Sequence, residues 1–376
     1  MSWSIKLFKV RGIDVKVHLT FVLILIWAAY IWSNNTGAGI QGALFGVVAT
    51  LLLFVAVTLH ELGHSFQALK FGVRVRDITL MPMGGLAQME KIPEKSSEEL
   101  RIAIAGPLVN FAIAGVLVIL GALLQVRSII SLEELSQSIG QVSWSGMLAY
   151  LTMANLALGL FNLIPAFPMD GGRVLRALLA MRMDFTKATQ IAANIGQGLA
   201  LLLGVWGFMS GSYTMVLIAI FVWIGAGQES KDVIVKDVLR DIKVRQAITL
   251  APQTLKANDL LSKAAELTLS TAQSDFPVIE WGTNRVVGVL GETELLRGLQ
   301  KHNSKLPVSE VMHANIPVIT HNEPLYLALE KMAKVRMRAA PVVDGEGQLV
   351  GFLTTADVNE AYRLFSIEQS YAPATR

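Results

Sequence analysis

The stretch LLLFVAVTLHELGHSFQAL, residues Leu51 to Leu69, is an apolar run interrupted by His60, Glu61 and His64. Its length suits a membrane-spanning helix, which needs about 20 predominantly apolar residues. Positions i and i+4 lie on one face of a helix, so both imidazoles can bind one metal ion with Glu61 beside it. Ionisable groups inside a membrane cost about 2.5–3.5 kcal/mol each and are kept mainly for function. The stretch therefore predicts a submerged metal site; the alternative is a polar cluster that pairs with neighbouring helices.

Charged residues are distributed unevenly along the chain. Residues 1–230 hold 15 Lys/Arg and 12 Asp/Glu, 27 of 230 or about 12%, whereas residues 231–376 hold 17 and 17, 34 of 146 or about 23%. Together with a hydrophobic fraction of 53%, this predicts a membrane domain at 1–230 followed by a soluble domain at 231–376. A net charge of +3 without a basic run argues against nucleic acid as a partner. The absence of cysteine excludes disulfides and thiolate ligands, so a metal must use His, Asp or Glu.

Uncharged apolar runs predict about six membrane-spanning helices and a multi-pass membrane protein. The first run lacks a small-residue cleavage site, so we expect a retained helix instead of a removed signal peptide. The runs are Val17–Leu69, split by SNNTGAG at Ser33–Gly39, then Ile102–Val126, about Trp144–Ile164, and Ala188–Gln228, turned at Ser210–Ser212. Lys and Arg gather on the side of the N-terminus, and only Arg127 falls opposite. This asymmetry predicts a cytoplasmic N-terminus and a cytoplasmic C-terminal domain, with the cell membrane as the location.

Between the second and third runs, VRVRDITLMPMGGLAQME (Val73–Glu90) alternates apolar and polar residues and breaks at Met83-Gly84-Gly85. Strict alternation interrupted by glycine is typical of a β-hairpin. The alternative is an ordinary amphipathic loop.

A third metal ligand is expected, because a zinc site for hydrolysis needs three protein ligands and an open fourth position. Asp170, in FNLIPAFPMDGGRVL (Phe161–Leu175), is the clear candidate in the membrane half. Two prolines precede it and two glycines follow, which predicts unwound backbone at membrane depth. The alternative role for Asp170 is as N-cap of the next helix. Asn162 in the same segment can hydrogen-bond a substrate carbonyl or oxyanion, or instead link helices.

HELGH on one apolar helix and NLIPAFPMDGG (Asn162–Gly172) on a later segment together resemble the site-2 protease family of intramembrane zinc metalloproteases. AGPLVN (Ala105–Asn110) and MPMGG (Met81–Gly85) support the resemblance. The extra helices and the C-terminal domain make the chain similar to the bacterial sporulation-type branch, which carries C-terminal tandem CBS domains. The resemblance implies an endopeptidase that hydrolyses a peptide bond within or near a transmembrane segment of a membrane-protein substrate. An alternative from another class is a CBS-regulated ion transporter.

Residue by residue, the resemblance implies one Zn²⁺ per chain, with His60, His64 and Asp170 as ligands and Glu61 as the catalytic carboxylate. It also implies Asn162 as a catalytic contact to the oxyanion or substrate. The hairpin residues Met83, Gly84 and Gly85 would bind the unwound substrate strand.

The C-terminal domain contains an internal repeat. DFPVIEWGTNRVVGVLGETELL (Asp275–Leu296) parallels AAPVVDGEGQLVGFLTTADVNE (Ala339–Glu360), with offsets of 63 to 64 residues. Each repeat predicts a strand, a turn, a second strand and a helix start, which indicates an α/β fold with repeats at about 240–300 and 308–366.

This repeat resembles a tandem CBS pair, which implies ATP, ADP or AMP as a regulator. In the second repeat, Thr354 and Thr355 would contact phosphate and Asp357 the ribose. The first repeat has Gly291 and Glu294 at the positions equivalent to Thr354 and Asp357, so we expect one ligand site. The alternative is a pair that serves only to form a homodimer.

Overall fold

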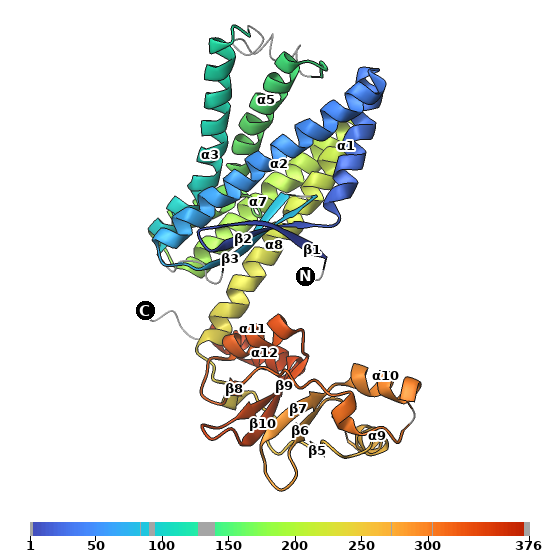
Figure 1. Ribbon diagram of the computed structural model, residues 1–376. Coiled ribbons are helices and arrows are strands. Elements are labelled where there is room, and N and C mark those ends of the chain that lie inside the picture. The colour runs from blue at the N-terminus through green and yellow to red at the C-terminus, as the bar shows by residue number, and fades with distance from the viewer. Residues whose placement is uncertain are drawn as a thin grey trace. The chain divides into compact units, whose positions relative to one another are not determined.

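The computed structural model describes residues 3–82, 84–89, 95–126, 140–271, 273–302 and 304–371. The chain divides into two compact units, Met1–Ser230 and Lys231–Arg376. Figure 1 gives the element labels used here.

Long helices make up most of the first unit (Figure 1). Among the described residues, five helices are long and apolar enough to cross a membrane: α2 (Gly39–Lys70), α3 (Ser96–Leu123), α5 (Trp144–Asn162), α7 (Phe185–Met209) and α8 (Tyr213–Arg240). The helix α1 (Phe21–Thr36) has 16 residues, or about 24 Å at 1.5 Å per residue, against a hydrocarbon thickness of about 30 Å. All six apolar runs are therefore helical, and five reach spanning length.

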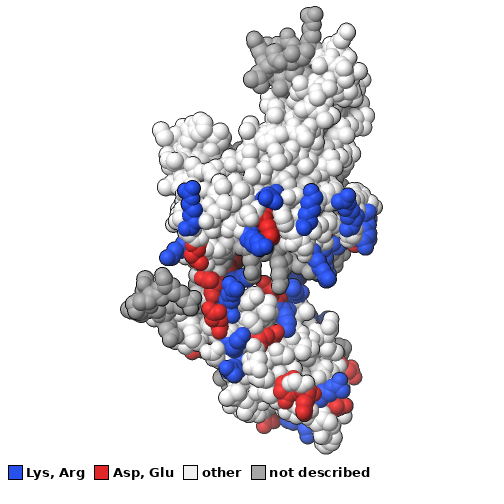
Figure 2. Space-filling view, turned by 90° about the vertical axis from the view of Figure 1, so that its left-hand side faces the viewer, with Lys and Arg blue, Asp and Glu red and all other residues white. Residues whose placement is uncertain are grey.

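These helices expose apolar side chains of a size that a water-soluble protein buries. Leu123, Phe208 and Leu202 are 76%, 82% and 68% exposed. On the face in Figure 2, the upper part of the helices carries almost no coloured residues, and Lys and Arg gather at their lower end. Such a surface is stable only against lipid, so the first unit is a polytopic helical membrane domain.

A four-stranded sheet completes this unit. Its order is β1-β2-β3-β4, with β1 (Ser4–Val10) antiparallel to β2 (Ile13–His18), β2 parallel to β3 (Val75–Met81), and β3 antiparallel to β4 (Gly84–Met89). The predicted β-hairpin at Val73–Glu90 is thus confirmed, and its second strand lies at the edge of the sheet. One face of the sheet packs on α2 and α3 through a shared apolar cluster that includes Ile78, Leu62 and Ile102.

The first two strands of that sheet were not predicted, although the sequence carries a signal for them. Ile13, Val15 and Val17 alternate with polar residues, which is a strand pattern. Arg11 and Gly12 both have positive φ, 46° and 90°, and form the tight turn that joins β1 to β2.

The second unit contains two copies of one motif. In the first, β5 (Leu255–Lys256) is parallel to β6 (Phe276–Ile279), and β6 is antiparallel to β7 (Val286–Leu290). In the second, β8 (Ile319–Thr320), β9 (Ala339–Val343) and β10 (Leu349–Thr354) pair in the same way. The helices are α9 (Leu261–Ser270) and α10 (Glu292–His302), then α11 (Leu325–Val335) and α12 (Thr355–Tyr371).

Each copy has its own apolar core. The helix α8 continues to Arg240, and its last turns contribute Val238 and Leu239 to the core of the second copy.

Candidate metal centre

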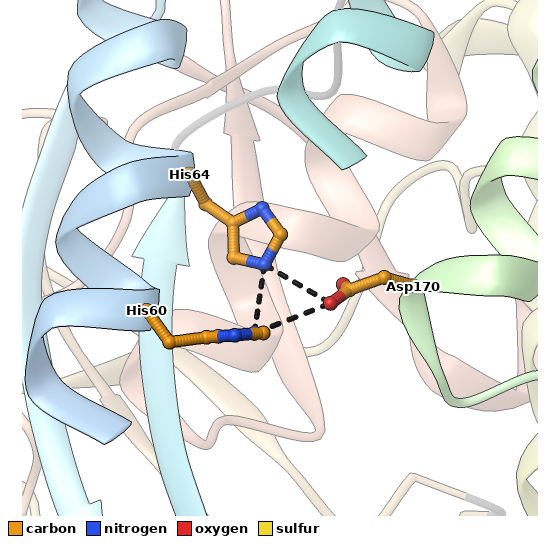
Figure 3. A group of neighbouring side chains, drawn as sticks. All are labelled: His60, His64 and Asp170. Carbon is orange, nitrogen blue, oxygen red and sulfur yellow. Dashed lines mark hydrogen bonds and ion pairs between the residues drawn. The ribbon is translucent and has the colours of Figure 1, made fainter. Parts of the chain in front are cut away.

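Three donor atoms from distant parts of the sequence converge in the membrane domain. His60 Nε2 lies 3.1 Å from His64 Nε2, and Asp170 Oδ2 lies 3.2 Å and 3.1 Å from these two nitrogens (Figure 3). All three side chains are buried. Ligands about 2.0–2.1 Å from a tetrahedral zinc lie roughly 3.3 Å from one another. The three residues could therefore hold a metal ion and leave a fourth position open.

The histidines point the same way because they lie four residues apart on α2, as the sequence predicts. Asp170 comes from a different element, the first residue of the short helix α6 (Asp170–Ala180). Its N-cap is Met169, so Asp170 is not the capping residue that the alternative required. A β-carbon on Gly171 would lie 2.2 Å from the carbonyl oxygen of Ile164, so only glycine lets α6 begin this close to the end of α5.

Both imidazoles are oriented by α3. His64 Nδ1 donates to the carbonyl oxygen of Ile102 at 2.7 Å. His60 Nδ1 bonds to Asn110 Oδ1, and Asn110 Nδ2 donates to Asn155 Oδ1 at 3.0 Å, which fixes the amide. Because a carbonyl oxygen only accepts, both Nδ1 atoms carry the proton and both Nε2 lone pairs face the converging donor set.

The glycine of the AGPLVN motif has a steric role at the same place. A β-carbon at Gly106 would lie 2.2 Å from His64 Nε2 and 2.7 Å from His60 Nε2. The motif supports the family resemblance, but the sequence alone gives no role to Ile102, Gly106 or Asn110. Only its proximity to HELGH in the fold reveals their contacts.

Glu61 lies next to the edge of the sheet. A β-carbon on Gly85 would lie 2.5 Å from Glu61 Cγ, so β4 passes directly beside this carboxylate. Gly84 opens the strand with a φ of 130°, which favours glycine. Of the three predicted hairpin residues, Gly85 thus lies beside Glu61, and Gly84 directly precedes it in β4. Met83 and the predicted outer-side Arg127 lie outside the described residues.

Asn162 ends α5 and is half-buried. Within the described part of the chain, its side chain makes no hydrogen bond to another residue, in contrast to the side chains of Asn110 and Asn155.

In the second unit, two of the three predicted nucleotide-contacting residues bond to each other. Asp357 Oδ2 accepts from Thr354 N and Thr354 Oγ1, both at 2.8 Å, and Asp357 N donates to Thr354 Oγ1 at 3.1 Å. This is a reciprocal capping box at the start of α12. Thr355 N donates to the carbonyl oxygen of Arg338.

A cavity of about 240 Å³ lies elsewhere in this unit, at the equivalent position of the first repeat. It is lined by Gly291 and Glu294 from the start of α10 and by Arg336 and Arg338 before β9, among others. Glu294 Oε1 pairs with His313 Nε2 at 3.2 Å. Burial raises the pKa of the Asp275 carboxyl in the same wall.

Comparison with known proteins agrees with this geometry. The model of peptidase family M50 matches residues 48–203, and that of the CBS domain matches residues 308–364. The zinc metalloprotease MJ0392 of Methanocaldococcus jannaschii is 36% identical over 369 residues, which cover 98% of this chain and 99% of the relative. The chain belongs to peptidase family M50.

Further relatives of this M50 peptidase cover parts of it. The stage IV sporulation protein FB of Bacillus subtilis is 30% identical over 161 residues, 42% of this chain and 49% of the relative. The solved site-2 protease from Methanocaldococcus jannaschii is 45% identical and covers 61% of this chain and 95% of its own, with a TM-score of 0.44. The protein is a zinc metalloprotease of the site-2 type with a C-terminal CBS domain pair, and an integral membrane protein. This assignment favours the peptidase over the ion-transporter alternative.

Proposed function

We propose that this chain hydrolyses a peptide bond within or near a transmembrane segment of a membrane-protein substrate, with one zinc held by His60, His64 and Asp170. The observation that carries the proposal is the convergence of three buried donor atoms within 3.2 Å of one another, two from the membrane helix α2 and one from α6. Two of these donors have partners at Ile102 and Asn110 that orient them for a metal.

Bound zinc supplies a Lewis acid that brings the pKa of a coordinated water to about 7. Glu61, one residue from His60, is the group that takes the proton from the attacking water and passes it to the leaving amine. Asn162 has an uncommitted amide and is proposed to donate to the oxygen of the scissile carbonyl.

The test is co-expression with membrane-protein substrates, comparing wild type with Glu61→Gln. The variant should retain bound zinc and lose cleavage, because glutamine keeps the size of the side chain but cannot accept the proton. Cleavage near the wild-type rate in Glu61→Gln contradicts the assigned role. Asn162→Ala should lower the rate and leave the zinc content unchanged.

The substrate is proposed to bind as an added strand on the edge of β4. A transmembrane helix hides its carbonyl groups in i to i+4 hydrogen bonds, so cleavage requires local unwinding to an extended strand. Among the described strands, β4 forms the edge of the sheet beside Glu61, which suits addition of a substrate strand. Helix-breaking residues in the substrate should speed cleavage. Proline introduced in turn at residues 85–88 should slow cleavage wherever it removes a backbone amide that points away from β3. If neither change alters the rate, β4 is not the docking strand.

We further propose that the N-terminus and the CBS unit face the cytoplasm, on the Lys/Arg asymmetry of the sequence. The chain has no cysteine, so single-cysteine variants can be labelled without background. Ser309→Cys should react with an impermeant thiol reagent only after the cytoplasmic side is opened, and Ser210→Cys from outside. The reverse labelling pattern would show that the chain has the opposite orientation in the membrane.

An adenine nucleotide is proposed to bind the CBS unit and to change the rate of proteolysis. The cavity at the first repeat supports this proposal because Arg336 and Arg338, which can pair with a phosphate, line it together with the acidic residues Asp275, Glu292 and Glu294. Thr354 and Asp357 must first release each other. That Thr354, Thr355 and Asp357 contact the ligand stays a prediction. Regulation requires that the nucleotide bind the more active and less active states with different affinity, and coupling of 5- to 150-fold is usual.

Calorimetry on the purified full-length protein with ATP, ADP and AMP tests this proposal. Arg338→Ala should weaken binding if the cavity is the site, and Asp357→Ala should do so if the second repeat is. No binding at millimolar concentration would leave the pair as a dimerisation module.

A further inference from the structure

A buried cluster of charged groups lies in the membrane domain outside the metal centre. Arg176 on α6 is wholly buried, and Glu99 on α3 is 3% exposed. Arg176 Nε donates to Glu99 Oε1 at 2.9 Å, and its Nη2 bonds to the same oxygen. Arg176 Nη1 donates to Glu229 Oε1 on α8 at 2.7 Å. A buried ion pair of this kind adds little net stability over apolar residues, so its position in the fold needs another reason.

The position of Arg176 relative to Asp170 supplies one. Arg176 follows Asp170 by six residues on the same short helix. Its guanidinium also lies over the ring of Phe167, three residues before Asp170, at 5.0 Å from the ring centroid. The Arg176 side chain, which follows the third ligand, thus contacts the side chain of a residue that precedes it.

The helix α3 connects this contact to the histidines. Glu99, Ile102, Gly106 and Asn110 are spaced by three and four residues, so they lie on one buried face of α3. Ile102 and Asn110 orient the imidazoles, and Glu99 pairs with Arg176. One face of α3 therefore contacts both histidines on α2 and, through Arg176, the helix α6 that carries Asp170.

The helix α8 contacts the same segment. A β-carbon on Gly225 would lie 2.8 Å from Pro168 Cδ, and Glu229 pairs with Arg176 one turn further on. The Glu229 side chain is 27% exposed, against 4% for that of Glu99, so we expect its contribution to be the smaller of the two.

We propose that Arg176 is a positioning residue that, through Glu99, sets Asp170 at bonding distance from the metal shared by His60 and His64. This inference rests on the proposed zinc centre. Side chains that orient metal ligands typically change metal affinity 10- to 100-fold when they are replaced. Arg176→Lys keeps the charge but loses the planar fork in which Nε and Nη2 donate to Glu99 while Nη1 donates to Glu229.

The experiment measures zinc affinity by chelator competition and the visible absorption spectrum of the Co²⁺-substituted protein, which reports coordination geometry. Variants are Arg176→Lys, Glu99→Gln and Glu229→Gln. Matched controls are Arg182→Lys, at an exposed arginine after α6, and Glu98→Gln, whose partner is the exposed Lys95. Thermal unfolding of the metal-free proteins reports folding separately.

Arg176→Lys and Glu99→Gln should raise the zinc Kd about 10- to 100-fold and shift the Co²⁺ spectrum, with a smaller effect in Glu229→Gln and none in the controls. A wild-type Co²⁺ spectrum and affinity in Arg176→Lys and Glu99→Gln would overturn the inference, even if their unfolding temperature falls. If Arg176→Lys does not fold, Glu99→Gln and Glu229→Gln decide by the same readouts. Wild-type protein that binds neither Zn²⁺ nor Co²⁺ would instead refute the metal centre itself.

Discussion

Replacing Gly106 with alanine should destroy the metal centre while leaving the helix intact. The added β-carbon would lie 2.2 Å from His64 Nε2 and 2.7 Å from His60 Nε2. Ordinary contact begins at 3.4 Å, so the His64 ring must move by 3.4 − 2.2, or about 1.2 Å. Metal–ligand distances tolerate only about 0.2 Å. The required shift is thus several times larger than a zinc site can absorb.

Neither ring can move freely to relieve this clash. His64 is bonded to the carbonyl oxygen of Ile102 on the same helix as Gly106, and His60 is bonded to Asn110. We therefore expect at least a 100-fold loss of zinc affinity in Gly106→Ala, which is about 2.7 kcal/mol. Proteolysis should fall with it.

Gly115 on the same helix provides the matched control, because a β-carbon there meets nothing within 4 Å. Gly115→Ala should bind zinc as the wild type does. Three measurements distinguish the two variants. Plasma emission spectrometry gives the zinc content per chain, chelator competition gives the zinc affinity, and circular dichroism reports whether the helices are intact. One zinc per chain at wild-type affinity in Gly106→Ala would show that the steric argument is wrong.

Three further predictions concern other contacts. Asp170→Ala should abolish stoichiometric zinc and proteolysis together, because it removes one of the three converging donors; full zinc occupancy in purified Asp170→Ala would exclude Asp170 as a ligand. Asn110→Ala should weaken zinc binding about 10- to 100-fold in chelator competition, since it removes the hydrogen-bond partner of His60 Nδ1. Asn155→Ala should have a smaller effect, because Asn155 contacts His60 only through Asn110. Equal effects of the two variants would argue against an ordered path from Asn155 to His60. Thr354→Val and Asp357→Ala should each destabilise the CBS unit by about 1 kcal/mol in the absence of nucleotide, because each breaks the capping box, and Thr355→Ala should not. Thermal unfolding measures the change in stability. Unchanged stability in all three variants would refute the capping role.

The sequence by itself determined the features that depend on local periodicity. The apolar runs gave the long helices, because about 20 uncharged residues can satisfy their backbone in lipid only as a helix. The spacing of His60 and His64 placed both rings on one helix face. The alternation around Gly84 gave the hairpin, and the offsets of 63 to 64 residues gave the repeated unit of the C-terminal half.

The tertiary structure alone decided which distant residues meet. Asp170 reaches His64 across 106 positions, and Arg176 reaches Glu99 across 77. The strands β1 and β2 join the hairpin through a parallel pairing that no local pattern specifies. Periodicity states which face of an element is apolar, but not which element packs against it. The contacts of Ile102, Gly106 and Asn110 with the histidines therefore followed only from the packing of α3 on α2.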